Sequence, residues 1–216
     1  LLQTVHLEPS VNLHEFPLYN PLGGYGSYIF PAVAALIVQQ TLLLGIGFLI
    51  VFLKQSNFQF DLPKLVGITL ACTFIGVLSC LYYFGFIFWL QDYPRDANIS
   101  ALLIATPVFV LSVVCISLWL GSLFDRPERA AQILTFTSVP FFLLTGASWP
   151  LESMPVWMSQ FAWIIPSTAG VRQFIQINQM HASLSDIYMN LIVLITLAVI
   201  FGAMAYYRLC QKVQKS

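Results

Sequence analysis

Long apolar runs, separated by short polar and proline-containing segments, dominate the hydrophobic pattern of this chain. A helix needs about 20 apolar residues to cross the hydrocarbon of a bilayer. Five runs without Asp, Glu, Lys or Arg reach that length, namely 28–53, 65–91, 97–124, 130–151 and 187–207. The pattern therefore predicts an all-α, polytopic helical membrane protein with about five transmembrane helices in a transmembrane domain at 28–216.

A sixth uncharged run, 153–171, has a different character. Pro155 and Pro166 interrupt it, and it carries Trp157 and Trp163. Proline removes a backbone donor, and Trp is enriched at the level of the lipid headgroups. We therefore expect a broken, re-entrant helical segment on the outer side of the membrane rather than a full span.

The composition supports a membrane environment and argues against a nucleic-acid partner. Hydrophobic residues make up 58% of the 216 residues and charged residues 8%, with a mean hydropathy of +0.81; soluble domains have about 25% charged residues. Nine basic and nine acidic residues give zero formal net charge, so the chain has no basic field for a nucleic-acid backbone.

The basic residues predict the orientation. If the segment before residue 28 lies outside, two basic residues, Arg95 and Arg172, lie on the outer side, and seven lie inside: Lys54, Lys64, Arg126, Arg129, Arg208, Lys212 and Lys215. This asymmetry follows the positive-inside tendency and predicts a cytoplasmic C-terminus. The opening stretch lacks the basic and apolar regions of a signal peptide, and we expect it to follow at least one further span.

The sequence predicts no catalytic, cofactor or metal site. The five runs contain no charged side chain, and no GxxxxGK[ST] phosphate loop occurs. The four cysteines lack CxxC spacing and suit helix packing better than metal binding. A cluster at His181, Ser183 and Asp186 contains the residue types of a hydrolase triad, but it is more simply a solvated entry to the last helix, with Ser185 as its N-cap.

Two groups of polar residues have two possible roles each. Gln39, Gln40 and Thr41 in the first run either line a substrate path or form hydrogen bonds across a helix interface. The loops at 54–64 and 124–132 carry the topology signal or dock a cytoplasmic partner, and Pro127 suits the first turn of a short helix there.

Two stretches resemble bacterial ABC-2 type permeases, the membrane subunits of ATP-driven exporters. YNPLGGYGSYIFP at 19–31, followed by IVQQTLLLGIG at 37–47, resembles the entry into the second span of that family. The segment at 141–183, with its SWP, MP-W and PST motifs, is similar to the family's outer re-entrant region. The order of the motifs agrees with the family over most of the chain.

The resemblance implies a permease with six spans in full, in the inner (cytoplasmic) membrane, with 1–27 as the tail of an extracytoplasmic domain. It also implies pairing with a second copy or a related permease, and docking of cytoplasmic ABC ATPase subunits that hold ATP and Mg. A periplasmic adaptor protein and membrane lipid are further partners to expect, and drugs, lipids or polysaccharides are substrate classes. A non-transporting scaffold or regulatory subunit and an envelope membrane enzyme are the alternatives.

Family members often have a Glu-rich coupling segment between the second and third spans, whereas this chain has only KQSNFQFDLPK. We therefore expect ATPase coupling to involve both cytoplasmic loops, through Lys54, Lys64, Asp125, Arg126, Glu128 and Arg129. On the outer side we expect a gate with Gln173 at its rim, or alternatively an aromatic belt that anchors the last helices. The residues of this gate are Trp149, Pro150, Trp157, Trp163, Pro166 and Arg172.

Overall fold

The computed structural model describes residues 25–91, 98–149 and 151–211, and their regular secondary structure is entirely helical. Four helices in this part of the chain are long and apolar enough to cross a membrane: Ile29–Gln55, Leu62–Leu90, Ile99–Leu123 and Tyr188–Gln211. They coincide with the predicted runs at 28–53, 65–91, 97–124 and 187–207, which confirms the all-α polytopic fold. The predicted tail at 1–27 falls almost wholly outside the described residues.

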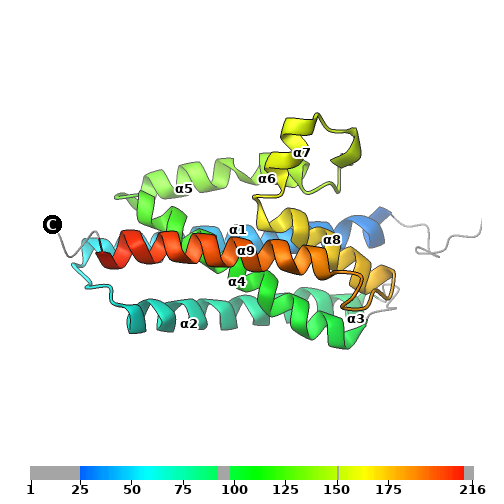
Figure 1. Ribbon diagram of the computed structural model, residues 1–216, viewed down its shortest axis with the longest axis horizontal. Helices are drawn as coiled ribbons and strands as arrows, with labels where there is room; N and C mark the ends of the chain where they lie inside the picture. Colours follow the sequence, from blue (N-terminus) through cyan, green and yellow to red (C-terminus); the bar gives the residue numbers. More distant parts are fainter. Residues whose placement is uncertain (1–24, 92–97, 150, 212–216) are drawn as a thin grey trace, which may run out of the picture.

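The four long helices lie side by side along the long axis of the molecule (Figure 1). They are α1 (Tyr25–Gln55), α2 (Leu62–Cys80), α4 (Ile99–Leu123) and α9 (Tyr188–Tyr206). α2 continues through the π-helical η1 (Leu81–Ile87) into α3 (Phe88–Leu90), and α9 continues into the π-helical η3 (Tyr207–Gln211). Asp61 caps α2 by accepting a hydrogen bond from the Lys64 amide, and Asn98 caps α4 by accepting one from the Ala101 amide.

α4 occupies the centre of the bundle and packs against α1, α2, α8 and α9. A Cβ atom at Gly121 of α4 would lie 3.1 Å from Cβ of Ile50 and 3.2 Å from Cα of Gly47, so α1 and α4 can approach this closely because Gly121 has no side chain. The outer faces of α2 and α9 are apolar: Leu70, Phe74 and Val199 are each more than 60% exposed. Such a surface suits contact with hydrocarbon.

The segment predicted as a fifth span, 130–151, is not one long helix. It forms α5 (Pro127–Phe136) and α6 (Ser138–Leu144), separated at Thr137. Pro140 has no N–H to donate to the carbonyl of Phe136, which explains the break. Gly146 follows the end of α6 with φ +84°, the left-handed conformation that stops a helix. Among the residues that the structure describes, the prediction of about five spans is therefore corrected to four candidate spans and a broken helix pair.

The run predicted to be re-entrant, 153–171, is a broken helical segment in the structure as well. It contains the end of η2 (Leu151–Ser153), the short α7 (Val156–Ala162) and the start of α8 (Pro166–Gln179). α8 runs to Gln179, beyond the predicted end at 171, because its buried face continues through Phe174, Ile177 and Asn178. α6 and α7 lie beside the bundle, whereas α8 packs against α1, α4 and α9 (Figure 1).

Candidate functional sites

The N-terminus of α8 lies inside the protein, where a side chain from α1 forms a hydrogen bond with it. Oε1 of Gln39 accepts a hydrogen bond of 2.7 Å from the backbone N–H of Ser167, and both residues are fully buried. The first turn of a helix leaves such N–H groups without a partner inside the helix. Gln39 thus performs for α8 the task of a capping residue, although it lies 128 positions away in the sequence.

The three polar residues predicted to line a path lie in different surroundings. Gln39 is buried against α8, Gln40 is half-buried, and Thr41 is exposed with its hydroxyl bonded back to the carbonyls of Ile37 and Val38. Nε2 of Gln39, both amide atoms of Gln40 and the hydroxyl of Ser167 are buried without a hydrogen-bond partner among the described residues. The contact with α8 favours the interface role for Gln39.

After this capped first turn, α8 packs against aromatic rings. Phe174 stacks on Phe84 with a centroid distance of 4.2 Å and meets the edge of Phe109 at 5.3 Å. Gly170 lies directly against Phe109, and a Cβ atom there would lie only 2.4 Å from a carbon of that ring. α8 is therefore fixed at its N-terminus by Gln39 and along its length by close packing.

The residues predicted to form the outer gate belong to two separate groups. Trp149 and Trp157 line an apolar pocket of about 360 Å³ between α6 and α7. Trp163 lies under the guanidinium of Arg172, which also pairs with Glu152 at 3.2 Å. Pro166 is buried at the first turn of α8, and Pro150 lies outside the described residues. Gln173, expected at a rim, is instead buried, with Nε2 donating to the carbonyl of Ala105.

Asp186, in the loop before α9, is held by hydrogen bonds from Ser183. Its carboxylate accepts hydrogen bonds from the backbone N–H and the hydroxyl of Ser183, at 2.8 and 2.7 Å, and these bonds lower the pKa of the Asp186 carboxyl. In a Ser-His-Asp triad a histidine accepts the serine proton, whereas here the Ser183 hydroxyl donates directly to Asp186. The predicted N-cap at Ser185 is wrong, since α9 begins at Tyr188 and the preceding residue is Ile187.

At the opposite end of the bundle, Lys54 joins α1 to the loop after α4. Nζ of Lys54 lies 2.7 Å from Oδ1 of Asp125 and donates to the carbonyls of Phe124 and Ser122 at 2.7 and 3.2 Å. Carbonyls at a helix C-terminus lack partners within the helix and favour a cation. The hydrogen bond from Lys54 lowers the pKa of the Asp125 carboxyl.

The other predicted coupling residues are exposed at the same end. Lys64 lies in the first turn of α2, where its Nζ is 3.1 Å from the carboxylate of Asp61 and donates to the carbonyl of Gln59. The side-chain hydrogen bond from Lys64 lowers the pKa of the Asp61 carboxyl. Arg126, Glu128 and Arg129 are exposed around the first turn of α5. α5 begins at Pro127, as predicted.

Sequence reasoning missed the buried polar side chains of α8 and α9. Nδ2 of Asn190 donates to Oε1 of Gln176 at 3.0 Å, and Asn178 is buried with Nδ2 bonded to the carbonyl of Phe174. The signal that could have found them is the cluster of amides in RQFIQINQ, which is too polar for a lipid-facing helix and too regular for a loop. Within the described residues, no group of three or more His, Cys, Asp and Glu side chains could hold a metal ion.

Comparison with known proteins identifies related chains. The chain is 24% identical over 213 residues to the probable multidrug ABC transporter permease YbhR of Escherichia coli K12, and equally to YbhR of Escherichia coli O157:H7. These matches cover 90% of this chain and 55% of each relative, so the chain spans about half the length of these curated relatives. Residues 1–207 match the family described as ABC-2 family transporter protein, and this multi-pass membrane chain therefore belongs to the ABC-2 transporter family.

Proposed function

We propose that this chain is the larger part of the membrane domain of a permease subunit in an ATP-driven exporter. The family match over residues 1–207 carries the proposal. The relatives named as multidrug ABC transporter permeases support a drug-like or other amphipathic substrate. The helices form the translocation path, and the chain performs no covalent chemistry.

A separate cytoplasmic ATPase supplies the energy and holds ATP and Mg, and two permease subunits pair to enclose the path. The subunit lies in the inner membrane with the C-terminus in the cytoplasm. The basic residues Lys54, Lys64, Arg126, Arg129 and Arg208 lie near the ends of α1, α4 and α9 and the starts of α2 and α5. This distribution supports the orientation under the positive-inside tendency.

We propose that the ATPase docks at the start of α5. Arg126, Glu128 and Arg129 are exposed there and available to a partner. Lys54 links this loop to α1, because it bonds to Asp125 and to the last carbonyls of α4. Movement of a docked ATPase would therefore act on α1 and α4 together, and α1 in turn holds α8 through Gln39.

Charge reversal tests the docking proposal. The double variant Arg126→Glu/Arg129→Glu in the full-length protein should insert normally but lose substrate-stimulated ATP hydrolysis and transport. Lys64→Glu is the comparison, because Lys64 in the first turn of α2 already pairs with Asp61, the N-cap of that helix. Unchanged assembly and transport in the double variant would contradict docking at α5. A larger loss of transport and ATP hydrolysis in Lys64→Glu would indicate that the ATPase docks at the 54–64 segment instead.

A further inference from the structure

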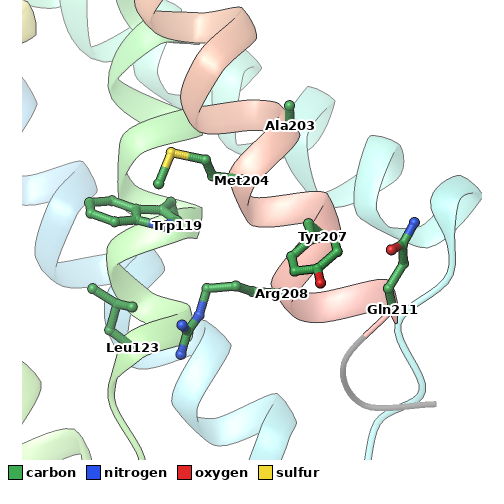
Figure 2. A pocket seen from close by; sticks show the side chains of 7 residues that line it. All are labelled: Trp119, Leu123, Ala203, Met204, Tyr207, Arg208 and Gln211. Atoms are coloured by element: carbon green, nitrogen blue, oxygen red, sulfur yellow. The ribbon is translucent and has the colours of Figure 1, made fainter. Parts of the chain in front are cut away.

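A pocket opens between α4 and the end of α9. Figure 2 shows the residues that line it: Trp119 and Leu123 from α4, and Ala203, Met204, Tyr207, Arg208 and Gln211 from α9 and η3. Its volume is about 660 Å³, which is within the range of small-molecule sites. The proposed ATPase docking site includes none of these residues.

The pocket combines an apolar wall with one cation. Trp119, Leu123 and Met204 form the wall, and the guanidinium of Arg208 extends along it toward Leu123 (Figure 2). Arg208 forms no ion pair with any residue that the structure describes, and its Nε is buried without a hydrogen-bond partner there. A buried, unsatisfied N–H is costly, so an anionic acceptor at this position would be stabilising.

The location of the pocket indicates where that acceptor comes from. Arg208 lies in the last turn of the span Tyr188–Gln211, and the preceding turns of α9 present exposed apolar side chains such as Ile192, Val199 and Ile200. This places Arg208 at the boundary between hydrocarbon and headgroups, a level at which Trp and Tyr are also enriched. Basic pockets between transmembrane helices on one side of a membrane suit anionic lipid headgroups.

We propose that this pocket binds an anionic phospholipid. The phosphate accepts hydrogen bonds from Arg208, the planar donors of which match a phosphate diester, and Gln211 borders the headgroup. An acyl chain lies along Trp119 and Met204 and continues over the apolar surface of α9. The inference does not depend on transport activity or on an ATPase.

The test is native mass spectrometry of the full-length protein titrated with phosphatidylglycerol or phosphatidylcholine of identical acyl chains. Arg208→Gln should reduce the preference for phosphatidylglycerol about tenfold, the effect of losing a charge-assisted hydrogen bond to the phosphate. Arg129→Gln removes the same charge from an exposed position at the same end and should leave the preference unchanged. Equal losses in both variants would indicate general surface attraction and would overturn the site.

A second variant leaves the charge in place. Ala203→Phe fills the pocket from its exposed wall and should lower phosphatidylglycerol binding while Arg208 is intact. Glycerol 3-phosphate, which carries the phosphate without acyl chains, should compete poorly. Full binding by Ala203→Phe, or displacement of the lipid by glycerol 3-phosphate at equal concentration, would contradict a lipid occupant.

Discussion

Replacement of Gln39 by Leu tests the contact that joins α1 to the buried end of α8. Leu has a similar volume but cannot accept the 2.7 Å hydrogen bond from the amide of Ser167. Both residues are fully buried, so water cannot replace the lost acceptor. Gln40→Leu is the matched control, because both side-chain polar atoms of Gln40 are buried without a partner among the described residues.

The magnitude follows from two opposing effects. Leaving a buried N–H without an acceptor costs about 1–3 kcal/mol, and measured hydrogen bonds between membrane helices are worth less, about 0.6 kcal/mol on average. Removal of the unpartnered Nε2 of Gln39 offsets part of this loss. We expect Gln39→Leu to lower the free energy of unfolding by about 1 kcal/mol and Gln40→Leu to leave it unchanged or raise it slightly.

The assay is SDS-driven unfolding of the full-length protein in mixed micelles, followed by far-UV circular dichroism. The difference between the two leucine variants is the informative quantity, since both remove one amide from the same helix. If Gln40→Leu destabilises the protein as much as Gln39→Leu does, the contact with Ser167 contributes nothing specific, and the proposed anchoring of α8 is refuted.

The remaining predictions concern packing and the ion pair at the end of α4, and the same unfolding assay measures the first two of them. Gly170→Val should destabilise the protein by about 1–3 kcal/mol, because its Cβ would overlap the ring of Phe109; Gly45→Val, at a position with no neighbouring atom within 4 Å of such a Cβ, should have little effect. Lys54→Met should lower the free energy of unfolding more than Asp125→Asn does, because Lys54 also donates hydrogen bonds to two carbonyls at the end of α4. The carboxylate of Asp125 is largely exposed, so its pairing should contribute less than about 1 kcal/mol. Since Lys54 lowers the pKa of Asp125, this contribution should be present above the ordinary value of 3.8 and disappear as the pH falls through the lower folded-state pKa. Thermal unfolding of wild type and Asp125→Asn between pH 7 and pH 3 measures it, and a difference that grows toward acid would contradict the assigned sign.

Hydropathy predicted the long helices well because the bilayer imposes one requirement on every span. A span must be long, apolar and internally hydrogen-bonded, and the runs that became α1, α4 and α9 meet that requirement along their whole length. The interruption at Thr137 depends on a single proline, Pro140, and on local bonds such as that from the Thr137 hydroxyl to the carbonyl of Leu134. The absence of charged residues from a run does not indicate whether its helix is interrupted.

The polar contacts were harder to predict because they join residues far apart in the sequence. Gln39 was identified as a polar residue in a span, but its partner Ser167 follows only from the fold. Similarly, the sequence placed Arg208 on the predicted cytoplasmic side without indicating that Trp119 lies across a pocket from it. Family resemblance was informative about the class of protein, whereas the roles of Arg126, Glu128 and Arg129 remain predictions.

The most direct test of the proposed function is affinity purification of the full-length protein from its native membrane in mild detergent, with identification of co-purifying proteins and an ATPase assay. The proposal predicts a stoichiometric P-loop ATPase that hydrolyses ATP in the complex and is stimulated by a transported substrate. Reproducible absence of such an ATPase would contradict an ATP-driven permease and would favour a non-transporting scaffold.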